Sequence, residues 1–312
     1  MFGFGPRYNY ERFTREMLDP KQHRALFEDA PRPGERAPDF EGRTLAGDRV
    51  RLSDFRGERN VVLVFGSGTC PMTAGSIRGL NALAEELRSD DLEFLFVYVR
   101  EAHPGESQPA HRSWEDKVDA AERFRDEDEV TMPMVVDDVR GAIHRKYGKL
   151  PNPAFVVDKS GRIAYRMMWT QPAPLAAALD ELLEAQQERG AEHAIVQGGE
   201  DLSMPLNYAL FHAYRALERG GRQAMEDFRQ AMGVRGRIAL AASRIAEPMS
   251  ENAGKIALTA ALSGAVLAGG IFAGMQLRKR RKPLAPDPYS FPKPKEPRSD
   301  RTGTDDYESL GI

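Results

Sequence analysis

The chain has 312 residues and a formal net charge of −3 at pH 7, from 44 lysines and arginines against 47 aspartates and glutamates. Acidic and basic residues are interspersed along its body, so the charge excludes nucleic acid as an expected partner. The length suits one or two domains. Cys70 is the only cysteine, which excludes an intrachain disulfide and leaves a sulfenic acid, a mixed disulfide or a disulfide-linked homodimer as oxidised forms.

The first 33 residues are expected to form an N-terminal extension ahead of the folded domain. Segment 1–7 lacks an apolar run that follows basic residues, so we expect no cleaved signal peptide. The domain itself is expected to begin at residue 34.

Residues 34–188 alternate strand-like and helix-like patterns, which predicts an α/β fold with a central mixed sheet flanked by helices. Short apolar runs predict buried strands, and apolar residues at helical spacing predict helices. The expected strands lie at 61–65, 92–99 and 134–136, with a strand, a tight turn and a strand within 153–163. The expected helices lie at 77–87, 113–125, 139–147 and 174–188.

Cys70 stands where strand 61–65 breaks into a Gly-Ser-Gly-Thr-Cys-Pro turn before helix 77–87. A thiol at such a turn lies beside unpaired backbone N–H groups and the positive end of the helix dipole, and both favour the thiolate. The plainer interpretation is a small buried core residue, which is the usual environment of a free cysteine. The position of Cys70 favours a redox or nucleophilic role.

The element order, the cysteine at the strand end and a proline before a later strand resemble the thioredoxin fold. In that fold the corresponding proline is cis and packs against the active-site thiol, and Pro153 is the candidate here. The alternative is a trans proline that begins an edge strand. We expect Pro153 to be cis and to support Cys70.

Three ordered segments resemble the iodothyronine deiodinase family more narrowly. They read Phe-Gly-Ser-Gly-Thr-Cys-Pro at 65–71, Val-Tyr-Val-Arg-Glu-Ala-His-Pro at 97–104 and His-Arg-Ser-Trp-Glu-Asp-Lys-Val at 111–118. The resemblance covers about residues 34–188. Two positions depart from the family, because Cys70 replaces a selenocysteine and Gly68 stands where members often have a cysteine. A thiol ionises less readily than a selenol, and an oxidised Cys70 would need an outside reductant or a second subunit.

The resemblance implies reductive dehalogenation of an iodinated phenol. The Cys70 thiolate would attack an aromatic iodine and take it as a sulfenyl iodide, which an external thiol reductant then reduces. A small thiol or a thioredoxin-like donor would supply the electrons, with no bound cofactor and no metal. The expected substrate is therefore a halogenated aromatic small molecule.

Five further residues complete the implied site. His103 and His111 are candidate proton donors or phenolate partners, because histidine changes charge near neutral pH. Glu101 would orient one of these imidazoles. The hydroxyls of Ser67 and Thr69 would hydrogen-bond to the thiolate. Plainer interpretations are surface histidines, a surface ion pair at Glu101 and a Thr69 side chain that satisfies the backbone of the turn.

Two other functions remain as alternatives. A peroxiredoxin-like peroxide reductase fits residues 37–57 and Ser67, which stands three positions before the cysteine. That family also needs a proline seven positions before the cysteine, where this chain has Leu63. The third function is a non-catalytic thioredoxin-fold membrane scaffold or redox sensor, in which Cys70 is modified but never turned over.

The C-terminal part differs in character from the domain. Residues 189–254 are expected to form a helical linker region, with helices at 205–218 and 221–233. Segment 255–277 predicts a transmembrane helix, because residues 256–277 carry no charge and about 20 apolar residues span a bilayer. A buried or surface-lying soluble helix is the alternative. The tail 278–312 begins with Arg-Lys-Arg-Arg-Lys and continues as a Pro-rich disordered segment.

We expect a single-pass membrane protein with its catalytic domain in the cytoplasm. The basic cluster 278–282 favours a cytoplasmic tail, and a single span would then place the Cys70 domain outside. Dependence on a cellular thiol reductant favours the cytoplasm for that domain. We give the need for a thiol reductant more weight than the charge rule and therefore expect a cytoplasmic domain. The basic cluster is assigned to contacts with anionic lipid head groups.

Overall fold

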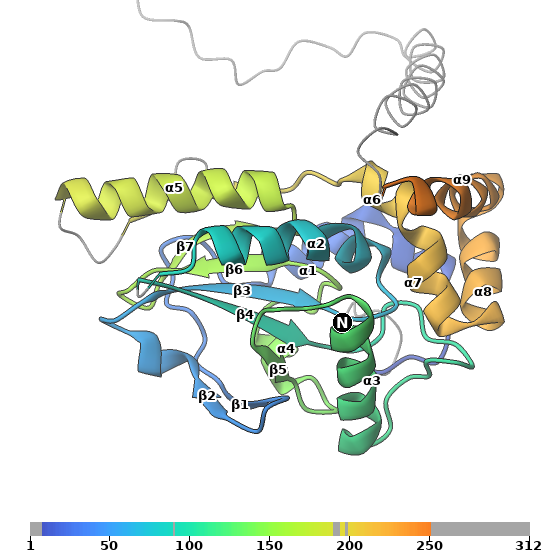
Figure 1. The fold of residues 1–312 in the computed structure, drawn as a ribbon, viewed down its shortest axis with the longest axis horizontal. Coiled ribbons are helices and arrows are strands. Elements are labelled where there is room, and N and C mark those ends of the chain that lie inside the picture. Colours follow the sequence, from blue (N-terminus) through green and yellow to red (C-terminus); the bar gives the residue numbers. More distant parts are fainter. Residues whose placement is uncertain (1–7, 90, 190–193, 197–198, 251–312) are drawn as a thin grey trace, which may run out of the picture. The chain divides into compact units, whose positions relative to one another are not determined.

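A computed structural model of the chain describes residues 8–89, 91–189, 194–196 and 199–250. They form a mixed sheet in the order β2-β1-β5-β4-β3-β6-β7-β8 (Figure 1). The strands are β1 Glu41–Thr44, β2 Arg49–Arg51, β3 Asn60–Gly66, β4 Leu92–Tyr98, β5 Met134–Val136, β6 Ala154–Val157, β7 Ile163–Met167 and β8 Glu200–Asp201. The helices are η1 Arg15–Leu18, α1 Pro20–Glu28, η2 Leu52–Phe55, α2 Pro71–Glu86, α3 Trp114–Glu127, α4 Ala142–Lys146, α5 Pro172–Arg189, α6 Leu206–Phe211, α7 Ala213–Gly220, α8 Arg222–Met232 and α9 Val234–Ser250.

Strand β3 is the centre of the sheet. All seven of its residues are buried, as expected of an apolar strand that is covered on both faces. It pairs in parallel with β4 and antiparallel with β6, and β7 returns antiparallel beside β6. The β3-α2-β4 unit, followed by the β6-β7 hairpin and α5, is a thioredoxin-like arrangement. The predicted fold of residues 34–188 is therefore confirmed.

Two apolar clusters fill the two faces of this sheet. Because successive side chains of a strand point to opposite faces, Val62 and Val64 of β3 pack with α2, α3 and α5. Leu63 and Phe65 point the other way and pack with α4 and with the segment around β1 and β2. This alternation fixes the register of β3, and hence the direction in which the chain leaves it at Cys70.

A third apolar cluster surrounds Cys70 at the end of β3. Phe13 enters it from the N-terminal segment, and Leu217 and Phe228 enter it from α7 and α8. The described parts of the N-terminal extension and of region 189–254 thus pack against the domain, and all three belong to one compact unit. The helices predicted at 205–218 and 221–233 correspond to α6 with α7 and to α8, and α9 follows them.

The predicted transmembrane helix at 255–277 and the predicted disordered tail at 278–312 lie outside the described residues, so both stay predictions. In the part of the chain that the structure describes, no helix combines the length and apolar character needed to cross a bilayer.

Candidate active site

Cys70 is held at the N-terminus of α2 by the way that β3 ends. It is the residue before the first helical turn, and Pro71 follows it at a position where a missing N–H costs nothing. A Cβ on Gly66 would lie 2.6 Å from Phe96 and 2.8 Å from Thr73, so a glycine is required where β3 meets α2. This close approach carries Cys70 into the interior, where it is only 2% exposed.

Cys70 lines a cavity of about 900 Å³. Its walls are largely aromatic and apolar, and they come from segments far apart in the sequence. The side chains that give it this character are Tyr10, Phe13, Met17, Met72, Trp169, Phe228, Met232 and Val234. Its volume is in the range of pockets that enclose a small organic ligand.

Burial raises the pKa of the Cys70 thiol. Backbone N–H groups of Thr73 and Met72 and the Thr73 hydroxyl act in the opposite direction, while the nearby Glu101 carboxylate also raises the pKa. The donors at the helix N-terminus favour the thiolate, as the sequence indicates, but they do not decide the direction of the shift. Desolvation inside the cavity outweighs the donors at the helix end.

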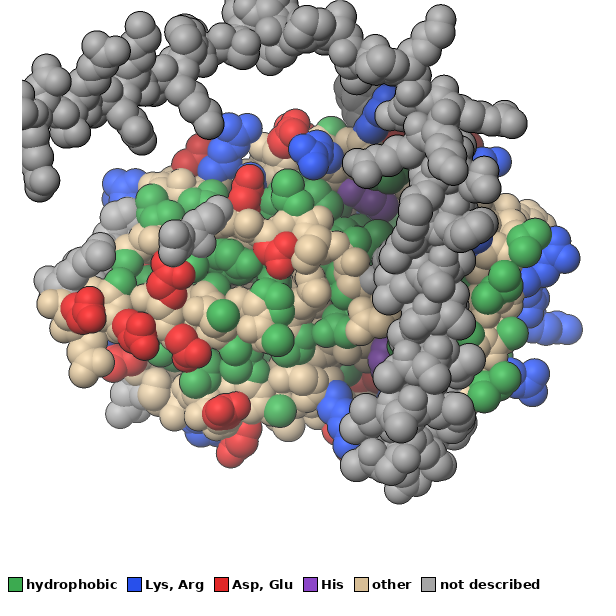
Figure 2. All heavy atoms as spheres, turned by 90° about the horizontal axis from the view of Figure 1, so that it is seen from above, with side chains coloured by type: hydrophobic (Ala, Val, Ile, Leu, Met, Phe, Trp, Pro, Cys, Tyr) green, Lys and Arg blue, Asp and Glu red, His purple; other side chains and the backbone are tan. Residues whose placement is uncertain are grey.

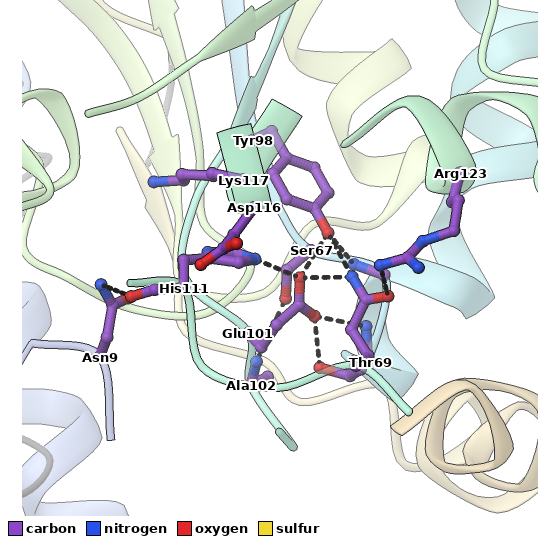
Figure 3. Close-up of polar contacts among 12 residues, drawn as sticks. Asn9, Ser67, Thr69, Tyr98, Glu101, Ala102, His111, Asp116, Lys117 and Arg123 are labelled. Carbon is purple, nitrogen blue, oxygen red and sulfur yellow. Dashed lines mark hydrogen bonds and ion pairs between the residues drawn. The ribbon is translucent and has the colours of Figure 1, made fainter. Parts of the chain in front are cut away.

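Glu101 organises the polar side of the site (Figure 3). Its Oε2 accepts hydrogen bonds from the backbone N–H of Thr69 at 3.0 Å and from the Thr69 hydroxyl at 2.6 Å. Its Oε1 accepts from the Tyr98 hydroxyl and from Gln108 Nε2, and it lies 3.2 Å from His111 Nε2. Burial opposes ionisation of Glu101, but the interactions with His111, Thr69 and Tyr98 prevail and lower its pKa to about 2.

Ser67 and Thr69 have partners other than the thiol. Ser67 Oγ accepts from the backbone N–H of Ala102 at 3.2 Å, and Thr69 Oγ1 bonds to Glu101 and accepts from the His103 N–H at 3.0 Å. Neither hydroxyl bonds to Cys70 in the described part of the chain. These two residues therefore tie the Cys70 turn to segment 101–103, rather than touching the thiolate as the sequence led us to expect.

His103 shares the cavity with Cys70. Its ring packs against Phe13 with centroids 4.0 Å apart and against Phe228 at 5.7 Å. Burial lowers its pKa to about 3, although Glu101 opposes this effect. The imidazole is therefore neutral at physiological pH, and its buried Nδ1 has no hydrogen-bond partner among the described residues.

His111 does not line the Cys70 cavity. It contacts Glu101 from the other side and lines a separate open groove of about 1030 Å³. Asn9 holds its backbone by donating to the His111 carbonyl oxygen at 3.0 Å. His111 thus reaches the Cys70 side only through the Glu101 carboxylate.

Pro153 is not cis, because no peptide bond in the described segments is cis. The trans isomer is the lower-energy form of an X–Pro bond. The Pro153 carbonyl accepts from the Phe65 N–H at 3.0 Å and so extends the β3–β6 ladder. Pro151 is the proline that lines the cavity. Between them, Asn152 Nδ2 donates to the Phe65 carbonyl and to Thr73 Oγ1.

Arg219 of α7 is a site residue that sequence reasoning missed. Its Nη1 donates to the Gly68 carbonyl at 2.6 Å, while its other nitrogens pair with Glu127 and Asp128. A Cβ on Gly68 would lie 3.0 Å from Arg219 Cδ. The Arg219 side chain therefore occupies the space beside Gly68 and clamps the turn that carries Cys70.

The cavity walls from η1, α8 and α9 were also missed, as was Thr73. Thr73 stands three residues after Cys70, and this helical spacing places its side chain over the first turn of α2. That signal was available in the sequence. For the helical walls, the sequence contains only the amphipathic patterns at 205–233 as a signal. Such patterns indicate that one face of a helix is buried but not which residues it packs against.

Comparison with known proteins agrees with this geometry. The sequence model of the iodothyronine deiodinase family matches residues 15–186, more than half of the chain. Thyroxine 5-deiodinase of Gallus gallus is 32% identical over 160 residues, which cover 47% of this chain and 61% of that protein. The enzyme of that name from Homo sapiens is 31% identical over 120 residues, covering 36% and 38%. The chain thus spans less than two thirds of either relative.

Among solved structures, the exposed lipoprotein thioredoxin of Streptococcus pneumoniae is 24% identical and superposes with a TM-score of 0.38, over 46% of this chain and 99% of that one. The extent of the family match decides the relationship. The chain belongs to the iodothyronine deiodinase family.

Proposed function

We propose that this oxidoreductase removes a halogen, iodine in the first instance, from an aromatic ring bound in the Cys70 cavity. The observation that carries the proposal is that the Cys70 thiol and the neutral His103 imidazole share a cavity whose walls include Phe, Tyr and Trp side chains and a second imidazole, that of His23. Flat aromatic rings pack well against such walls. The buried Nδ1 of His103 is available to a phenolic hydroxyl on that ring.

The reaction balances with two external thiols. The Cys70 thiolate attacks iodine, the carbon–iodine bond breaks, and the ring carbon takes a proton while Cys70 becomes a sulfenyl iodide. The first thiol displaces iodide and forms a mixed disulfide with Cys70. The second thiol releases Cys70 and leaves as a disulfide. Because the chain has one cysteine, both reducing equivalents come from outside it.

His103 and Glu101 have different roles in this scheme. A neutral His103 bonds to the substrate hydroxyl and does not serve as an imidazolium acid, because its pKa is about 3. Glu101 does not touch the cavity. It positions His103 and Cys70 through Thr69, which binds the Glu101 carboxylate and the His103 backbone at once.

The test is iodide release from an iodophenol by the full chain with a dithiol as reductant, measured beside peroxide consumption. Cys70→Ser should lower iodide release by roughly 1,000-fold or more, and His103→Ala by roughly 100-fold. His212→Ala is the matched control, since His212 lies on α6–α7 and does not line the cavity. Peroxide turnover without iodide release would overturn the proposal in favour of a peroxide reductase.

A further inference from the structure

Helix α9 carries an apolar stripe on its outer face. Val234, Ile238 and Ile245 are 65, 55 and 65% exposed. Together with exposed Ala241 they follow the spacing i, i+4, i+7 and i+11, which places all four on one side of the helix. Large aliphatic side chains this exposed along one stripe mark an interaction surface rather than a random surface composition.

The opposite side of α9 is already used for packing. α9 contacts α6, α7 and α8, and its buried residues lie opposite the stripe on the helix. These buried residues are Gly236, Ala239, Leu240 and Ser243. The helix is thus apolar on two sides, and the fold accounts for only one of them.

Three arginines flank the exposed stripe. At 100° per residue, Arg235 falls on one side of the stripe, and Arg237 and Arg244 fall on the other. All three are exposed. Figure 2 shows hydrophobic and basic side chains next to one another at the right-hand side, where α7 to α9 lie in Figure 1.

We propose that this outer face of α9 docks on the surface of an anionic lipid bilayer, with the stripe in the acyl boundary and the arginines at the head groups. Apolar residues bordered by long cationic side chains are the pattern of a helix that lies in the interface, because arginine stems lie along the apolar region while their charges reach phosphate. The positive charge of this face favours an anionic over a neutral bilayer, since three arginines attract anionic head groups.

The sequence that follows α9 is consistent with a lipid surface as the partner of this face. After α9 the sequence enters the uncharged segment 256–277 and then the basic cluster 278–282. The N-terminal end of α9 also belongs to the Cys70 cavity, because Val234 and Arg235 line it. Docking would therefore place this wall of the cavity at the lipid surface. The docking itself does not depend on the proposed reaction.

The experiment places an environment-sensitive fluorophore on the stripe in the full chain. In a Cys70→Ser background, Ile238→Cys supplies the only thiol for labelling, and Ile195→Cys is the matched control at another isoleucine, 53% exposed and away from α9. Emission is recorded with vesicles of phosphatidylcholine alone and of phosphatidylcholine with phosphatidylserine.

We expect a blue shift of the label at position 238 that is much larger with phosphatidylserine, that weakens at high salt and that is absent at position 195. Replacing Arg235 and Arg237 by glutamine should raise the vesicle concentration for half of the shift by roughly 30-fold. Three results would overturn the proposal: no shift at 238 with vesicles that bind the protein, an equal shift with both lipids, or a blue-shifted label without vesicles. The last result would assign the stripe to a second copy if it depends on protein concentration, and to residues 251–312 if it does not.

Discussion

The sheet side and the helical side of the Cys70 cavity are built in different ways. On the sheet side, one buried carboxylate, Glu101, accepts hydrogen bonds from Thr69, Tyr98 and Gln108 and lies beside His111 within a single polar cluster. The helical side, from η1, α8 and α9, is mostly apolar, with Arg15 and Arg235 as charged lining residues, and has no comparable buried polar cluster around the cavity among its described residues. The sheet side therefore holds the Cys70 turn in place, and the helical side closes much of the cavity.

The difference matters because the family match stops at residue 186. It includes the whole polar cluster around Glu101, and of the helical side it includes only the N-terminal segment from residue 15. Helices α8 and α9 lie beyond it. The polar cluster is thus the part of this protein that its relatives can inform, whereas the cavity walls from α8 and α9 lie outside the matched region.

The largest expected effect comes from breaking the sheet side at its centre, with Glu101→Gln. The glutamine side chain has one NH₂ group in place of a carboxylate oxygen. In one orientation this group faces the donors of Thr69, and in the other it faces the donor of Gln108 beside His111. We expect iodide release to fall by roughly 100-fold, because Cys70 and His103 lose their common anchor. Unfolding should become easier by about 3 kcal/mol, the cost typical of breaking a buried pair.

Glu93→Gln is the control for that change. Glu93 lies on β4, the strand that leads to the Glu101 segment, and makes one partly exposed ion pair with Arg59, so its loss should cost less than about 1 kcal/mol. Denaturant unfolding and iodide release of the two variants test the contrast. Equal effects would show that Glu101 contributes no more than a partly exposed ion-paired carboxylate and that the polar cluster has no special role.

A smaller effect is expected from Arg219→Met, which removes the α7 side chain that clamps the Cys70 turn. The Gly68 carbonyl loses its donor and buried Asp128 loses an ion-pair partner, so stability should fall by about 2 kcal/mol. We expect kcat to fall roughly 30-fold because the Cys70 turn is less well held. Activity should be measured well below the unfolding temperature, so that the folded enzyme is compared.

The control is Arg215→Met on the same helix. Arg215 also pairs with Asp128 but is 42% exposed, and its hydrogen bond goes to the Glu127 carbonyl rather than to Gly68. It should leave kcat within about threefold of the parent enzyme. If Arg215→Met and Arg219→Met lower kcat alike, the bond to Gly68 does not position the turn, and α7 acts only through general stability.

The same division explains what the sequence could predict. Strand β3 and helix α2 were foreseeable because the apolar run 61–65 and a regular helical spacing after Cys70 are local signals. The association of Cys70 with Glu101 and His103 was foreseeable through the family motifs. Hairpin β1–β2 was missed, because its short strands are largely exposed and show no apolar alternation.

The remaining errors arise where distant segments decide the outcome. The pKa of Cys70 follows from burial under Phe13 and Phe228, which lie 57 residues before and 158 residues after it in the sequence. The trans state of Pro153 could not be predicted from its own segment, because an X–Pro bond can adopt either isomer. A strand-to-helix turn in the sequence predicts the effect of the helix dipole on the thiol pKa. It gives no information about which distant segments bury the thiol.

The smallest expected effect tests the thiol itself, at the first turn of α2. Because burial raises the pKa of Cys70, the rate of alkylation should follow a titration curve against pH. The midpoint of that curve should lie above the value of about 8.5 for a free thiol. Thr73→Val removes a hydroxyl that favours the thiolate, so the midpoint should rise by about one unit and alkylation at neutral pH should slow by about tenfold. Thr73→Ser keeps the hydroxyl and should keep the parent midpoint. A parent midpoint below that of a free thiol would mean that the donors at the helix end outweigh the helical side of the cavity after all.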